Sequence, residues 1–172
     1  MHIAGEERRT GVSIAPRQRI QEGSADGWVY RAELYEYVAT PPVSRSPVLQ
    51  HSVELSGAWW HNLHQALDLL SHVPTSREAV REQYIHRRVP EFTGITPGEI
   101  AWTTGHGDLH WANLTSPPLS LLDWEGWGAA PVGYDAANLY LHFLPIPDLA
   151  ERVRVVYSDL ADSVRQYLDH LS

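Results

Sequence analysis

The chain has 172 residues, of which 43% are hydrophobic and 20% charged, and this composition predicts one globular domain or one domain carrying a fragment of another. The absence of cysteine excludes a disulfide framework, a thiolate zinc site and a cysteine nucleophile. The net charge of -8 argues against a nucleic-acid partner, because binding to phosphates needs a dense cationic surface. Residues 1–11 are charged and polar, unlike a signal peptide, and the apolar stretches are too short to span a bilayer. We therefore expect a cytoplasmic protein without a membrane partner.

Two β-prone runs lie within residues 12–38 and are separated by a polar stretch at 23–27. This pattern predicts a β-hairpin with a longer loop, whose second strand covers 28–38. Residues 39–48 (ATPPVSRSPV) contain three prolines and two serines, which break regular structure and indicate a boundary. We expect a small N-terminal part, 1–40, and a larger second part, 41–172.

The second part has a mainly helical pattern. Apolar residues recur at spacings of three and four over 50–72 and again over 148–171, and both segments are predicted to be amphipathic helices. Thr75 and Glu78 form a T-x-x-E capping box, which predicts a further helix over 75–88.

Residues 99–147 have a different, mixed pattern. The apolar run 119–124 (LSLLDW) is typical of a buried strand, and helical character returns at 135–143. Together with the hairpin and the helices, these elements predict an α+β fold that is mostly helical. Polar residues in this region fall on loops beside short strands, where catalytic residues are often found.

One segment of this region carries a dense polar motif. Residues 106–113 spell H-G-D-L-x-x-x-N, and Asp123 follows the apolar strand ten residues after Asn113. A loop can direct Asp108 toward a substrate hydroxyl, and a short hairpin can return Asp123 to the side of Asn113. Amide and carboxylate oxygens are ligands that Mg²⁺ prefers. Phosphoryl transfer requires such a metal and a carboxylate that orients or deprotonates the attacking hydroxyl.

The motif and the D-W-E that begins at Asp123 resemble those of the aminoglycoside phosphotransferases and related small-molecule kinases, which have a protein-kinase-like fold. The resemblance implies that Asp108 is the catalytic carboxylate and that Asn113 and Asp123 bind Mg²⁺. It also implies transfer of the γ-phosphate of ATP or GTP to a hydroxyl of a small, aminoglycoside-like molecule.

The same resemblance assigns supporting residues. Asp135, in the segment P-V-G-Y-D, is similar to an aspartate that begins a helix and braces the catalytic loop through backbone hydrogen bonds. His106 is expected to support the site structurally. Glu36 and Val38 would lie at the hinge, where the family's backbone meets the adenine.

On this mapping, 41–172 is the C-terminal lobe of a kinase-like fold and the hairpin is a remnant of the N-terminal lobe. The family's N-terminal lobe supplies a lysine and a loop that hold the phosphates, but this chain contains no lysine and no glycine-rich loop near its start. We therefore expect a truncated protein, a fragment or a short homologue, that is weakly active or inactive alone. An exposed apolar lobe face would then be open to self-association or to a partner.

Other interpretations remain open. Asp108 can be a turn residue and Asn113 a loop cap, since both are common roles for these residue types. The sequence H-x-D-x-H at 106–110 is also compatible with a transition-metal site, although that leaves Asn113 and Asp123 unexplained. The alternative functions are a non-catalytic, kinase-derived binding or regulatory module and, less favoured, a metal-dependent hydrolase.

Overall fold

The computed structural model describes residues 13–14 and 17–142. The helix expected over 148–171 lies outside these residues. Within them, three α-helices and six short strands form an α+β structure, in agreement with the mixed fold expected from the sequence. No helix in this part of the chain has both the length and the apolar character needed to cross a membrane.

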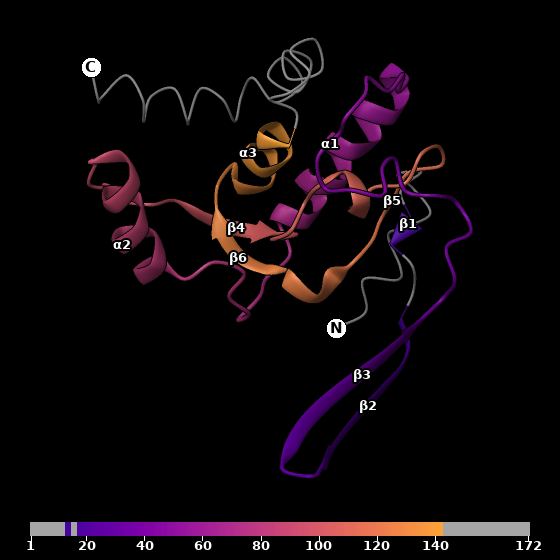
Figure 1. Cartoon of the computed structure of the whole chain (residues 1–172), viewed down its shortest axis with the longest axis horizontal. Helices are drawn as coiled ribbons and strands as arrows, with labels where there is room; N and C mark the ends of the chain where they lie inside the picture. Colours follow the sequence, from indigo (N-terminus) through magenta and orange to yellow (C-terminus); the bar gives the residue numbers. More distant parts are fainter. Residues whose placement is uncertain (1–12, 15–16, 143–172) are drawn as a thin grey trace.

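The predicted N-terminal hairpin is present. Strands β2 (Arg17–Ala25) and β3 (Trp28–Tyr35) pair antiparallel, with Ala25 opposite Trp28. The expected longer loop is wrong: Asp26 and Gly27 alone form the turn, both with positive φ, as a tight hairpin turn requires. The hairpin extends away from the other elements (Figure 1), and Trp28 is 79% exposed.

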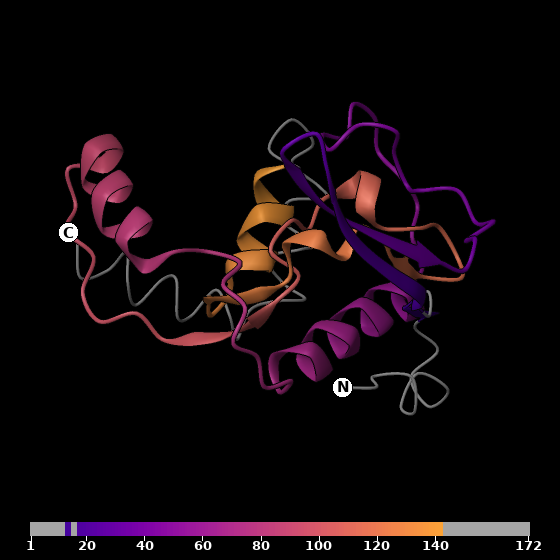
Figure 2. The same cartoon turned by 90° about the horizontal axis from the view of Figure 1, so that it is seen from below.

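Helix α1 (Gly57–Ser71) supplies much of the core. It begins seven residues later than expected, because the side chain of Ser56 accepts a hydrogen bond from the backbone N–H of Trp59 and caps the helix. The helix lies beside β4 (Trp102–Gly105; Figure 2), where the hydroxyls of Thr103 and Thr104 donate to the backbone oxygens of Ser71 and Val73 at its C-terminal end. The buried core combines apolar residues of α1 with others from the segment before it and from the chain between 109 and 139: Leu49, Leu55, Trp59, Trp60, Leu63, Leu109, Trp111, Leu114, Leu119, Leu121, Ala136 and Leu139.

The helix expected over 75–88 is wrong in its position. Helix α2 spans Glu82–Thr93, and its N-cap residue makes no side-chain capping bond. The segment before it pairs instead with β6 (Gly128–Pro131): Ala129 N donates to Arg77 O at 2.8 Å, and Ala79 N donates to Ala129 O at 3.0 Å. These tertiary backbone bonds hold 77–80 in a non-helical conformation against β6, so the local capping signal does not nucleate a helix.

The remaining strands form two small pairs. β4 and β6 pair antiparallel, with Gly105 opposite Gly128. β5 (Ser120–Leu121) is much shorter than the strand expected over 119–124, and it pairs in parallel with β1 (Ser13–Ile14).

Three short helical elements lie in the chain after β4. The 3-10 helices η1 (Trp111–Asn113) and η2 (Trp124–Gly126) lie in the loops, and α3 (Tyr134–Leu141) follows β6. Among them, α3 is the helix expected over 135–143.

The packing of α1 gives a stability prediction. Leu63 is fully buried, whereas Leu69 on the same helix is 43% exposed. Leu63→Ala should lower the free energy of unfolding by about 2–5 kcal/mol, because it removes buried methyl groups and leaves a cavity. Leu69→Ala is the matched control and should change it by less than about 1 kcal/mol. Equal losses in urea denaturation would contradict this placement of the core.

Candidate functional site

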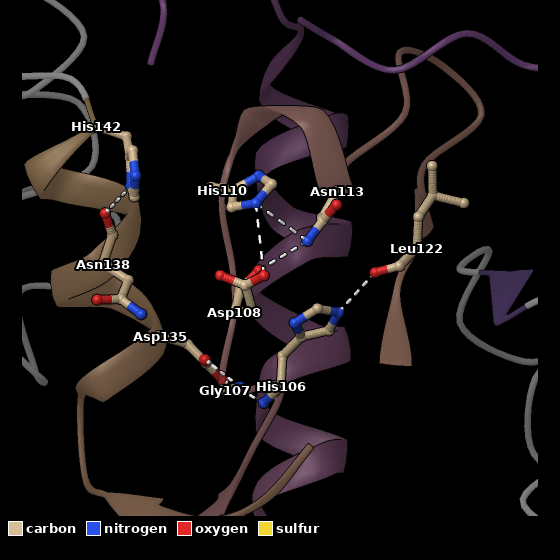
Figure 3. A network of polar contacts seen from close by, with 9 residues as sticks. All are labelled: His106, Gly107, Asp108, His110, Asn113, Leu122, Asp135, Asn138 and His142. Atoms are coloured by element: carbon tan, nitrogen blue, oxygen red, sulfur yellow. Dashed lines mark hydrogen bonds and ion pairs between the residues drawn. The ribbon is translucent and has the colours of Figure 1, made fainter. Parts of the chain in front are cut away.

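The loop that begins at His106 is held by Asp135. The backbone N–H of His106 donates to Asp135 Oδ2 at 2.6 Å, and that of Gly107 donates to Oδ1 at 2.9 Å (Figure 3). Asp135 is 9% exposed and lies in the first turn of α3. Burial raises its pKa, whereas the two N–H bonds and His106 act in the opposite direction. The hydrogen bonds expected from the sequence between Asp135 and this loop are therefore confirmed.

His106 ties the same loop to the strand beyond. Its ring is fully buried, and Nε2 lies 2.8 Å from the carbonyl oxygen of Leu122. Since a carbonyl can only accept, Nε2 carries the proton. Nδ1 is buried without a hydrogen-bond partner among the described residues. Burial lowers the pKa of His106, outweighing the nearby Asp135 carboxylate, and keeps the ring neutral.

Asp108 and Asn113 lie on one turn of the loop with His110 (Figure 3). The Asp108 side chain is 57% exposed, and its Oδ2 lies 3.6 Å from His110 Nε2. Asn113 is buried, and its amide nitrogen donates to the backbone oxygen of Asp108 at 3.0 Å. Its amide oxygen points away from Asp108. The loop thus offers one accessible carboxylate and holds the amide next to it.

The chain returns to Asn113 through the segment that leads to Asp123. Leu122 N donates to Asn113 O at 2.8 Å, and Leu114 and Leu121 form an antiparallel bridge. This backbone pairing is the short hairpin expected between Asn113 and Asp123. Asp123 itself has φ +59°, a left-handed conformation that costs a non-glycine residue free energy and is often found at functional sites.

Two glycines bring the turn after Asp123 against the Asp108 loop. Gly107 has φ +82°, and a Cβ at this position would overlap the backbone oxygen of Gly126. A Cβ on Gly126 would in turn lie 3.7 Å from the Cβ of Asp108. The backbones of the two segments therefore touch, a contact that any side chain at Gly107 would prevent.

Asp123 lines a cleft of about 1060 Å³ together with the end of the hairpin. The expected hinge residues, Glu36 and Val38, line the same cleft. Asp108 and Asn113 are not among its lining residues, although Asp108 lies close to Gly126 in the turn after Asp123. The remaining walls are largely aromatic and apolar: Tyr35, Tyr37, Pro42, Leu121, Leu122, Trp124 and Trp127, with Thr40, Arg77 and Glu125 as polar members.

The donor set fits a magnesium ion better than a transition metal. Asn113 and Asp123 offer amide and carboxylate oxygens, which suit Mg²⁺ when water and phosphate complete the coordination. No three His, Cys, Asp or Glu side chains within the described ranges gather into a metal site, the H-x-D-x-H residues included.

Two features of the site escaped the sequence analysis. His110 has a side chain only 13% exposed and contacts both Asp108 and Asn113. Arg77 reaches the cleft from a segment 50 residues before Trp127, and only tertiary pairing with β6 brings it there. The H-x-D-x-H spacing could have drawn attention to His110, but no local pattern marks Arg77.

The chain matches no protein-family model, no curated protein and no solved structure.

The bonds to Asp135 give a second prediction. Asp135→Ala should lower the free energy of unfolding by about 1–3 kcal/mol for each backbone N–H that stays buried without an acceptor. Asp68→Ala, at an exposed position of α1, is the control and should change it little. Equal effects of both substitutions in chemical denaturation would show that the Asp135 bonds do not hold the loop.

The burial of His106 gives a pH prediction. Its pKa is below the usual 6.5 in the folded chain, so the unfolded chain binds this proton first as pH falls. The stability due to neutral His106 is present above pH 6.5 and is lost progressively as pH falls toward the folded-state pKa. From about pH 7.5 to about pH 5.5, the wild type should lose more unfolding free energy than His106→Gln, whose amide can still donate to Leu122. Parallel pH profiles would contradict a buried neutral ring.

Proposed function

We propose that the chain is a phosphotransferase-family protein with a kinase-like C-terminal lobe, and that its chemistry is transfer of the γ-phosphate of ATP or GTP to a hydroxyl of a small molecule. The observation that carries this proposal is the bracing of the Asp108 loop by Asp135. Two hydrogen bonds link residues that are 28 and 29 positions apart in the chain. The resemblance of the motif to those of the small-molecule kinases implies this partnership from the sequence alone.

The cleft supports a nucleotide as the co-substrate. Its aromatic walls suit a planar base, and backbone groups at 36–38 can meet the edge of that base. Asp123 lines the same cleft, where its carboxylate would face a metal and the phosphates. A magnesium ion held by Asn113 and Asp123 would neutralise phosphate charge.

Asp108 would act on the acceptor. Its exposed carboxylate can orient the substrate hydroxyl and take up its proton. The hydroxyl oxygen then bonds to the γ-phosphorus, and the bond from that phosphorus to the bridging oxygen breaks, releasing ADP or GDP. His110 and Asn113 hold the loop conformation that presents this carboxylate.

A second candidate is a non-catalytic, kinase-derived binding or regulatory module. The absence of lysine from the whole sequence favours it, because the family's phosphate-holding lysine then has no counterpart of its own type. The exposed apolar side chains of the hairpin are compatible with a role in binding a partner or a second copy. Magnesium-dependent nucleotide binding separates the two candidates, because the first requires it and the second does not.

The proposal predicts magnesium-dependent nucleotide binding. Calorimetric titration with ATP and GTP should show binding that is stronger with Mg²⁺, and Asp123→Asn should weaken it by about tenfold or more. Asp108→Asn should leave binding nearly unchanged, because Asp108 acts on the acceptor. It should abolish any ATP consumption, which we expect to be very weak in the wild type.

Either of two results would contradict this proposal. One is nucleotide binding that is independent of Mg²⁺ and of Asp123. The other is ATP consumption that persists in Asp108→Asn, measured with a panel of small hydroxylated acceptors.

A further inference from the structure

Arg77 is an exposed residue whose guanidinium group is nevertheless fixed at the cleft. Its Nε donates to the backbone oxygen of Trp127 at 3.0 Å, and its Nη2 donates to that of Glu125 at 2.6 Å. The guanidinium carbon also lies 5.0 Å from the centre of the Trp127 ring, in cation–π contact. Three contacts therefore hold a charged group that a surface arginine would leave mobile.

Arg77 has no carboxylate partner in the described part of the chain. Its two hydrogen bonds there are donated to backbone carbonyl oxygens. Among the described residues that line the cleft, it is the one cation, and three acids, Glu36, Asp123 and Glu125, accompany it. A guanidinium has more N–H donors than these two bonds use. It therefore keeps donors for an anion inside the cleft.

We propose that Arg77 binds a phosphate group of the nucleotide in this cleft. This inference rests on the proposed function and names the residue that supplies the cationic charge in a chain without lysine. Arginine suits the role, because its planar fork matches phosphate geometry and keeps its charge at every physiological pH. The contacts to Glu125 and Trp127 fix the fork in advance, which lowers the entropy cost of binding.

A purely structural role would be different. In that case Arg77 would only brace the 125–127 turn, and its loss would weaken every ligand of the cleft to the same extent. Binding to phosphate instead weakens ligands in proportion to their phosphate content. Comparing ligands with the same base and different phosphate chains separates the two roles within one variant.

The experiment is calorimetric titration of the full chain with adenosine, ADP, ATP and tripolyphosphate in the presence of Mg²⁺. Arg77→Gln should weaken ATP binding by about tenfold and leave adenosine binding within about twofold of the wild type. Arg77→Lys, which keeps the charge and loses the fork, should give an intermediate affinity for ATP. Arg81→Gln, four residues on and outside the cleft lining, is the matched control and should bind every ligand as the wild type does.

The outcomes separate this inference from the proposed function. Equal loss of adenosine and ATP binding in Arg77→Gln would overturn the inference and leave a bracing role, while the nucleotide site stands. A different outcome is that tripolyphosphate binding needs Arg77 and that ATP binds no more tightly than tripolyphosphate. This would support Arg77 as a phosphate site and overturn the nucleotide proposal. A wild-type chain that binds none of the four ligands would overturn both.

Discussion

The site depends on one carboxylate that accepts two backbone N–H groups. Asp135 fixes His106 and Gly107, and the loop that follows carries Asp108. The fold leaves room for this: a Cβ on Gly105 would lie 2.8 Å from Asp135 Oδ2, so β4 must end in a residue without a side chain. The carboxylate belongs to α3, which follows β6, and the loop follows β4. The two bonds therefore connect the segments that follow these two paired strands.

From this anchor, neighbouring contacts extend to the cleft. His106 bonds to Leu122, whose N–H bonds to Asn113, so that the loop and the segment before Asp123 share one network. The contact between Gly107 and Gly126 adds a direct backbone junction. A ligand bound against Asp123 and the turn behind it would therefore meet a surface whose shape is set by buried hydrogen bonds, which is the condition for pre-organised electrostatics.

The sequence allowed prediction of the features that depend on local pattern or on a distinctive motif. The hairpin, α1, α3 and the Asp135 bonds belong to this class. The predicted position of α2 is wrong because the T-x-x-E signal at Thr75 is weaker than the backbone pairing of this segment with β6. Such pairing depends on residues far away in the chain, so the local sequence does not show it. The fixed position of Arg77 was missed for the same reason, since its partners lie 48 and 50 residues away.

The measurement that tests the account most directly is a crystal structure of the chain with Mg²⁺ and a non-hydrolysable ATP analogue. The account predicts the base beside Glu36 and Val38, and the metal bound by the side-chain oxygens of Asn113 and Asp123 with the phosphates between. Asp108 should remain open to solvent beyond the terminal phosphate. A nucleotide bound outside this cleft, or a metal that contacts neither Asn113 nor Asp123, would contradict the account.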